Sequence, residues 1–113
     1  MQVFHEADFP YRHGDHGPKY LLRGPRMNFG FVRLRPGDVV SPHYHQVMEE
    51  NFYILEGEAS FTVNGEPLAA HAGDLVHLEP GDTHRIENKA NSVLQMVIAL
   101  APFQESDKIS IEE

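Results

Sequence analysis

The 113-residue chain has no cysteine. It therefore forms no disulfide bond and offers no thiolate to a metal ion, so a bound metal must rest on nitrogen and oxygen ligands. We expect a cytoplasmic location, since nothing in the chain requires an oxidising compartment. Long apolar runs are also lacking, because even the stretch from Val93 to Ala101 is interrupted by Gln95. The sequence predicts neither a signal peptide nor a membrane span.

Basic residues are scarce in this chain. Nine lysines and arginines face 17 acids, which leaves a formal net charge of −8. This charge repels a phosphate backbone, so we expect no nucleic-acid partner. The length is that of one compact domain with a modest core.

Uninterrupted segments of helical length are missing between Gly24 and Gly81, where glycine and proline recur at short intervals. Such punctuation predicts an all-β domain. The segments between the breaks are rich in Phe, Val, Ile, Leu and Tyr, as strands are. The expected strands are Met27–Leu34, Phe52–Leu55, Ala59–Val63, Leu75–Leu78, Arg85–Glu87 and Val93–Leu100.

One tight turn and two irregular ends complete the prediction. Asn64 and Gly65 follow an alternating run, and this dipeptide supplies the positive φ angles of a type I′ hairpin turn. Proline and glycine predict an irregular arm over residues 1–25, with room for one short strand around Tyr20 to Leu22. We expect a β-barrel domain over residues 26–104 and an acidic tail over residues 105–113 that frays.

Four of the side chains have the spacing of metal ligands. His43 and His45 are two residues apart, so in a strand both imidazoles point to the same face. Glu50 follows after enough chain to pass a bend and return its carboxylate to that side, whereas Glu49 would face away. His84 comes after a turn-forming stretch that can bring a distant strand beside them.

Two stretches of the chain resemble the two motifs of the cupin superfamily. Residues 37–57 read GDVVSPHYHQVMEENFYILEG, which fits Gly, five residues, His-X-His, four residues, Glu, six residues, Gly. Residues 73–88 read GDLVHLEPGDTHRIEN, which fits the second motif except that Glu79 replaces its first proline. That position shapes a turn in the family and is not a ligand. Glu49 is the rival to Glu50, but only Glu50 leaves six residues before Gly57.

The resemblance implies a cupin double-stranded β-helix, or jelly-roll barrel, with one divalent metal ion on His43, His45, Glu50 and His84. Three imidazoles and one carboxylate suit Mn, Fe, Co, Ni or Zn, and an octahedral ion keeps about two open positions. The resemblance favours Mn or Fe. Cupins commonly form dimers, and apolar strands such as Phe29–Val32 and Val97–Leu100 are suited to such an interface, so we expect a homodimer.

Catalytic residues are not identified by the sequence beyond weak candidates. His77 is predicted on a barrel strand, as a pocket histidine or, more in keeping with most histidines, a structural one. Gln95 is a core amide or a group lining the barrel. Arg33 and Arg35 share a predicted strand face and could clamp a carboxylate, although such arginines are usually solvated. His5, His13 and His16 belong to the arm, which is either disordered or a lid.

The resemblance implies an enzyme that acts on a small oxygenated organic acid chelated by the metal, with oxalate-decarboxylase-like or dioxygenase chemistry. Metal-assisted sugar or uronate isomerisation or elimination is an alternative. A non-catalytic metal-binding or ligand-binding module is another. The fold alone does not decide among them.

Overall fold

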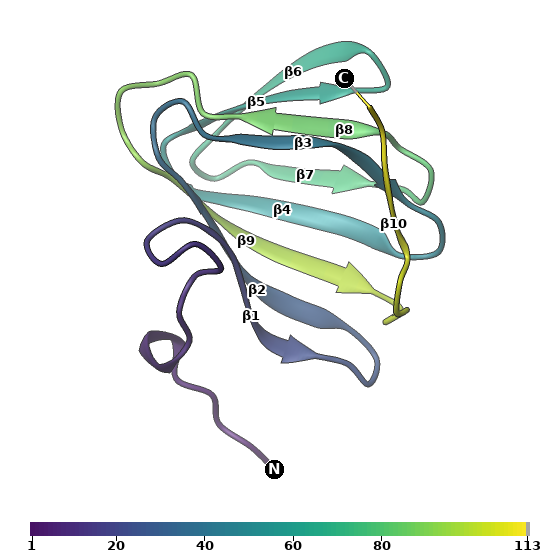
Figure 1. Cartoon of the computed structure of the whole chain (residues 1–113). Helices are drawn as coiled ribbons and strands as arrows, with labels where there is room; N and C mark the ends of the chain where they lie inside the picture. Colours follow the sequence, from purple (N-terminus) through teal and green to yellow (C-terminus); the bar gives the residue numbers. More distant parts are fainter. Residues whose placement is uncertain (113) are drawn as a thin grey trace.

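The computed structural model describes residues 1–112 and contains two antiparallel sheets of five strands each (Figure 1). The strand orders are β1-β2-β9-β4-β7 and β10-β3-β8-β5-β6. This is the all-β jelly roll that the sequence predicts. The elements are η1 (Glu6–Asp8), β1 (Gly17–Arg23), β2 (Asn28–Leu34), β3 (Val39–His45), β4 (Glu49–Glu56), β5 (Glu58–Val63), β6 (Glu66–His71), β7 (Leu75–Leu78), β8 (His84–Glu87), β9 (Leu94–Ala101) and β10 (Lys108–Ser110).

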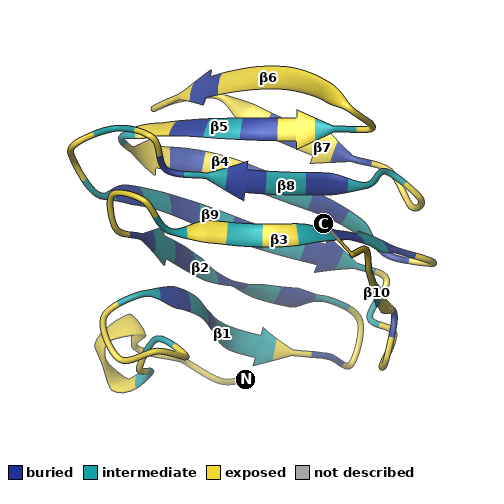
Figure 2. Ribbon diagram, turned by 45° about the horizontal axis from the view of Figure 1, so that its top comes forward, coloured by how far each residue is buried: buried dark blue, intermediate teal, exposed yellow. Residues whose placement is uncertain are grey.

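The core lies between the two sheets, and buried residues alternate with less buried ones along strands such as β2 and β9 (Figure 2). Ile54 from one sheet and Ile86 from the other are fully buried. The rings of Phe52 and Phe61 meet across the sheets with centroids 5.6 Å apart. Each such side chain stabilises the fold by about 1.5–3 kcal/mol through the apolar surface it buries.

Six predicted strands correspond to β2, β4, β5, β7, β8 and β9. Their boundaries agree to within one residue, except that β4 begins at Glu49 rather than Phe52. The prediction placed at most a short strand where the seven-residue β1 lies, and it omitted β3, β6 and β10. Buried and half-buried residues alternate along β9, so only one face of this strand is fully buried.

The predicted turn at Asn64 and Gly65 is confirmed, with φ angles of 50° and 83°. The Asn64 side chain also ties this turn to the loop that precedes β8. Its amide nitrogen donates to Asp82 Oδ1 over 2.9 Å, and its amide oxygen accepts from the backbone nitrogen of Thr83 over 3.0 Å. The hairpin therefore holds the start of β8 in place.

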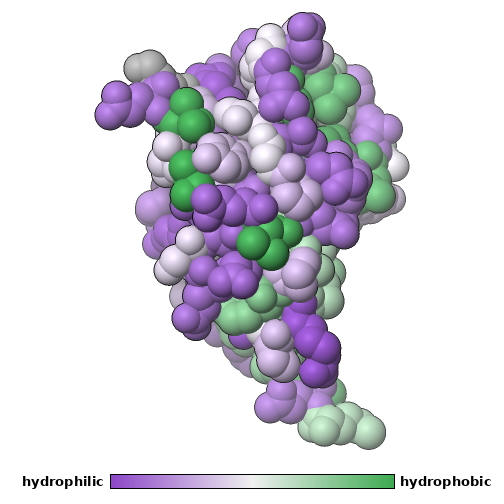
Figure 3. Space-filling model, turned by 90° about the vertical axis from the view of Figure 1, so that its right-hand side faces the viewer, coloured by the Kyte–Doolittle hydropathy of each residue, from purple (hydrophilic) through white to green (hydrophobic). Residues whose placement is uncertain are grey.

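Both ends of the chain contribute strands. β1 lies within the predicted arm and pairs with β2, while β10 lies within the predicted tail and pairs with β3. The division into arm, barrel and tail stays a prediction. The face in Figure 3 is mainly hydrophilic, with hydrophobic side chains in separate spots. No helix among residues 1–112 has the length and apolar character needed to cross a membrane.

Candidate metal centre

The structure brings His43, His45, Glu50 and His84 together inside the barrel. The two histidines of β3 lie beside β8, where His43 pairs in register with His84. Glu50 comes from β4 in the opposite sheet. All four side chains are buried, with exposed fractions between 1 and 8%. Glu49 points outward instead, and its carboxylate accepts from the amide of Asn51 over 3.0 Å.

The imidazole nitrogens converge on one carboxylate oxygen. The distances from Glu50 Oε1 are 2.8 Å to His84 Nε2, 3.3 Å to His45 Nε2 and 4.0 Å to His43 Nε2. Ligand atoms about 2.1 Å from one ion lie about 3 Å apart when adjacent and about 4.2 Å apart when opposite. The three distances from Glu50 Oε1 therefore fall in the range expected for ligands of a single ion. One donor atom from each of His43, Glu50 and His84 also falls within a mutual distance of 4.8 Å, whereas His45 is not part of that group and approaches the centre through Glu50.

Backbone carbonyls orient two of the imidazoles. His43 Nδ1 lies 2.9 Å from the carbonyl oxygen of Ser41, and His84 Nδ1 lies 3.0 Å from that of Asp82. A carbonyl only accepts, so each Nδ1 carries the proton and donates it. The Nε2 atom of the neutral ring then presents a lone pair to the interior, which is the form that binds metals.

These atoms fit a cation. Glu50 Oε1 and His84 Nε2 are buried and have no hydrogen-bond partner among the described residues, although they approach to 2.8 Å. Two facing lone pairs at that distance repel each other unless a proton or a metal ion lies between them. The donor set of imidazoles and a carboxylate suits a divalent transition metal. The chain's residues therefore fit the metal that the sequence motifs imply.

The pKa values follow from burial and mutual contact. Burial lowers the pKa of His43 to about 4, so that imidazole is neutral at neutral pH. Burial alone would raise the pKa of Glu50, but His45 and His84 outweigh it and lower the pKa to about 2. Burial would lower the pKa of His84, and the Glu50 carboxylate outweighs it and raises that pKa. The carboxylate is thus ionised and available as a ligand.

Asp107 lies next to the candidate centre, on the far side of the His45 ring. The sequence analysis did not predict this residue. Its buried carboxylate accepts from the backbone nitrogens of Val47 and Met48 over 2.8–3.1 Å. Its Oδ2 atom lies 3.9 Å from His45 Nδ1, on the side of the ring away from Glu50. It therefore fixes the chain that leads from β3 into β4.

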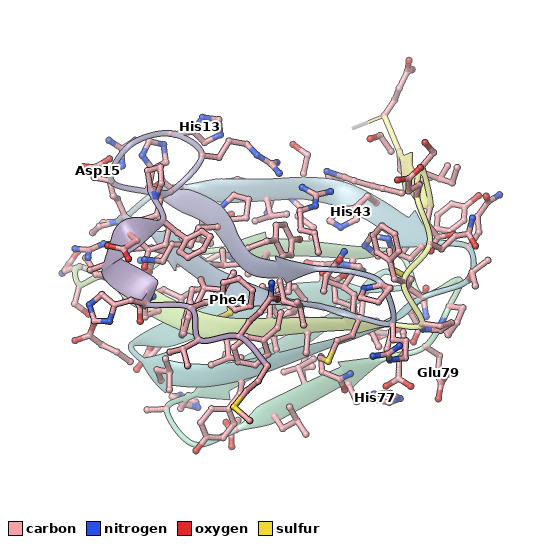
Figure 4. All side chains as sticks on the ribbon, turned by 90° about the horizontal axis from the view of Figure 1, so that it is seen from below. Phe4, His13, Asp15, His43, His77 and Glu79 are labelled. Carbon is pink, nitrogen blue, oxygen red and sulfur yellow. The ribbon has the colours of Figure 1, made fainter. Side chains whose placement is uncertain are left out.

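The weak catalytic candidates all lie outside the barrel interior. His77 is exposed on β7, where Nδ1 contacts Asn51 Oδ1 at 2.6 Å and Nε2 contacts Glu79 Oε1 at 3.0 Å (Figure 4). Gln95 is on the outer face of β9 and donates to Tyr11 Oη over 2.7 Å, so the expectation of a core or barrel-lining amide is wrong. Arg33 pairs in register with Gln95 and shares its face.

Arg35 and Glu79 both have local partners in the structure. Arg35 does not join Arg33 in a clamp, because it forms an ion pair with Asp38 at 3.1 Å. Glu79 stands where the second cupin motif has its first proline. In this chain the backbone nitrogen of Glu79 donates to Asp82 Oδ2 over 2.9 Å. A proline at that position would lack this donor.

A cavity of about 880 Å³ is lined by His43, His45 and Glu50, whereas His84 does not line it. That volume lies within the range of about 300–1,000 Å³ typical of small-molecule sites. His13 and His16 of the predicted arm line it, whereas His5 does not. Figure 4 shows His13 on the loop before β1. Three further lining residues, Tyr20, Arg23 and Asn28, were missed by sequence reasoning, because only the pairing of β1 with β2 reveals their inward positions.

Comparison with known proteins identifies the family. The Cupin domain model matches residues 30–100, so the chain belongs to the cupin family. It is 36% identical over 82 residues to an oxalate-binding protein of Thermotoga maritima, covering 73% of this chain and 68% of that protein. It is 33% identical over 74 residues to the tetracenomycin polyketide synthase protein TcmJ of Streptomyces glaucescens. That match covers 66% of this chain but only 50% of TcmJ.

Solved structures agree on the fold. An uncharacterized conserved protein with a double-stranded beta-helix domain from Klebsiella pneumoniae superposes with a TM-score of 0.84. The match covers 100% of this chain and 99% of that one at 20% identity. The chain is therefore a small cupin with the double-stranded β-helix fold, and this fold alone does not determine its chemistry.

Proposed function

We propose that the protein is a metal-dependent cupin enzyme that acts on a small oxygenated organic acid. The observation that carries the proposal is the buried Glu50 Oε1 atom, which has three imidazole nitrogens within 4.0 Å and no hydrogen-bond partner among residues 1–112. His43, His45, Glu50 and His84 would hold one divalent ion per chain, with Mn or Fe favoured and Co, Ni or Zn also compatible. A bound ion supplies Lewis acidity or redox chemistry at its open positions.

The cavity supports a substrate that reaches the centre. Its wall includes His43, His45 and Glu50, so a molecule inside it can approach these ligands directly. Similarity to an oxalate-binding protein supports an acid with two chelating oxygens. Decarboxylase-like or dioxygenase chemistry is the reaction type we propose for such an acid. Sugar or uronate isomerisation and simple ligand binding are the alternatives that the experiment must separate.

A turnover screen tests the proposal. Protein loaded with Mn(II) or Fe(II) is incubated with oxalate and larger hydroxy and oxo acids, and carbon dioxide release and oxygen uptake are recorded. We expect turnover with at least one acid, a loss of about 100-fold or more in His84→Ala, and normal activity in His71→Ala, whose side chain is 61% exposed. Binding without turnover would overturn the enzyme proposal in favour of a binding module, and isomerisation of a sugar acid would favour the alternative reaction.

We also propose a cytoplasmic homodimer formed through the outer face of the β1-β2-β9-β4-β7 sheet. Phe29, Phe31 and Val97 are partly exposed there, and Leu75 is 63% exposed. Light scattering at micromolar concentration should give twice the chain mass of 12.8 kDa. A monomeric mass would overturn this proposal without affecting the metal centre.

A further inference from the structure

One row of inward positions runs across a sheet from the candidate metal centre. Glu50 pairs with Leu100, Leu100 pairs with Asn28, and Asn28 pairs with Arg23. Paired residues of an antiparallel ladder project from the same face. Because neighbouring strands lie about 4.8 Å apart, the Cα atom of Asn28 is about 10 Å, and that of Arg23 about 14 Å, from that of Glu50. The row thus extends along the cavity wall.

Asn28 lines this cavity and carries an unpaired polar atom just behind the cavity wall. The residue is 5% exposed and lines the cavity, and its amide oxygen Oδ1 is buried without a hydrogen-bond partner among the described residues. Buried polar atoms in folded proteins are nearly always paired, and an unpaired one destabilises the fold. A rotation of the amide toward the cavity would bring this acceptor to a hydroxyl donor on a bound molecule.

Arg23 is an exposed residue that lines the rim of the cavity and provides a positive charge at the far end of the row. Its guanidinium carbon lies 5.1 Å from the centroid of the Tyr20 ring, and both residues line the cavity. Such a cation–π contact uses none of the N–H donors of the guanidinium. No carboxylate among residues 1–112 forms an ion pair with Arg23, although the chain carries 17 acids. An arginine whose N–H groups are free can donate two parallel hydrogen bonds to a carboxylate.

We propose that Arg23 and Asn28 form a second subsite that recognises the far end of an organic dianion. One end of this ligand would present two chelating oxygens to the candidate metal centre, a carboxylate would bind Arg23, and a hydroxyl between them would donate to Asn28. The subsite rests on the proposed function and narrows its substrate class to hydroxylated dicarboxylic acids longer than oxalate.

Three probes separate the contributions, with binding to the Mn(II)-loaded protein measured by calorimetry. 2-Oxopentanoate has the chelating end alone, 2-oxoglutarate adds the far carboxylate, and 4-hydroxy-2-oxoglutarate adds the hydroxyl. We expect 2-oxoglutarate to bind about tenfold tighter than 2-oxopentanoate, a preference lost in Arg23→Gln. Arg26→Gln is the matched control, because Arg26 is an exposed residue between β1 and β2 that does not line the cavity.

We expect 4-hydroxy-2-oxoglutarate to bind several-fold tighter than 2-oxoglutarate, because its hydroxyl donates to Asn28. Asn28→Leu should remove this difference in affinity. Equal binding of the two oxo acids to the wild type, or a preference that survives in Arg23→Gln, would overturn the subsite. Failure of the protein to take up metal would instead overturn the proposed function.

A second readout needs no metal. Replacing Asn28 by Leu removes an unpaired polar atom from the interior, so the melting temperature of the metal-free protein should stay the same or rise. A melting temperature lower by several degrees would show that Asn28 serves the fold rather than a ligand, and would overturn its place in the subsite.

Discussion

Asp107 contributes to the site from a segment that the sequence predicts to fray. The carboxylate lies beneath the bend between β3 and β4, where two backbone nitrogens donate to it. Hydrogen bonds to a buried charge are stronger than those between neutral groups. Asp107 therefore anchors β10 beside the strand that carries His43 and His45.

Replacing Asp107 by Ala should lower the free energy of unfolding by about 3 kcal/mol, because the backbone nitrogens of Val47 and Met48 lose a charged acceptor. Asp74→Ala is the matched control, since that carboxylate is 55% exposed and accepts from the backbone nitrogen of His71 in a surface turn. Urea denaturation of the metal-free proteins measures both changes. Equal losses in the two variants would contradict the anchoring role.

Tyr20 gives the protein a defined response to alkaline pH. Burial, with a smaller effect from the Glu50 carboxylate, raises the pKa of Tyr20 from 10.0 to about 12. The unfolded chain therefore loses this proton first, so stability is complete below pH 10 and declines as the pH rises towards 12.

In Tyr20→Phe the decline between about pH 10 and 12 should be smaller than in the wild type, since the ionisable group is gone. Urea midpoints measured across this range provide the test, with Tyr53→Phe on the outer face of β4 as the control. Identical pH dependence in wild type and Tyr20→Phe would contradict the assignment.

At this scale the candidate ligands could be predicted from the sequence, whereas the residues around them could not. His43, His45, Glu50 and His84 were selected because the motif spacings separate them from the other histidines and acids. The roles of Tyr20, Asn28 and Asp107 depend on which strands pair, and no local pattern in the chain encodes that information.

Among the elements, the β1-β2 hairpin is the one whose geometry depends most on a single residue. Gly30 is buried in β2 opposite Tyr20, where the register of the hairpin shifts. A Cβ atom on Gly30 would lie 2.0 Å from the carbonyl oxygen of Lys19 and 2.8 Å from the Cα atom of Tyr20. The close approach of the two backbones fixes the wall that carries Tyr20.

Gly30→Ala should destabilise the protein by about 3 kcal/mol or more, because a backbone atom cannot move aside as a flexible side chain does. Gly65→Ala is the control, since its Cβ would meet nothing within 4 Å and only the positive φ angle carries a cost, about 1 kcal/mol. Thermal melting of both variants tests the difference. A loss in Gly30→Ala no greater than that in Gly65→Ala would contradict this account of the hairpin.

Strands were predicted where apolar residues alternate and missed where backbone pairing alone defines them. β6 is almost wholly exposed, contains Pro67 and is held at a sheet edge by β5. β3 contains Pro42 and a register shift between Val40 and His43. β10 spans only three residues. None of these segments shows the apolar alternation on which the prediction depended.

For the molecule as a whole, the candidate centre joins the two sheets. His43, His45 and His84 come from one sheet and Glu50 from the other, so a bound ion would link both layers across the barrel. An ion that binds only the folded chain also stabilises it by mass action. The metal centre is therefore expected to matter for stability as well as chemistry.

The most direct test is the metal content of the purified protein after loading with Mn(II) and extensive dialysis, determined by plasma mass spectrometry. We expect about one ion per chain in the wild type, little or none in Glu50→Gln and His84→Ala, and a wild-type value in His71→Ala. A wild-type protein that retains no ion, or variants that retain as much as the wild type, would contradict this expectation.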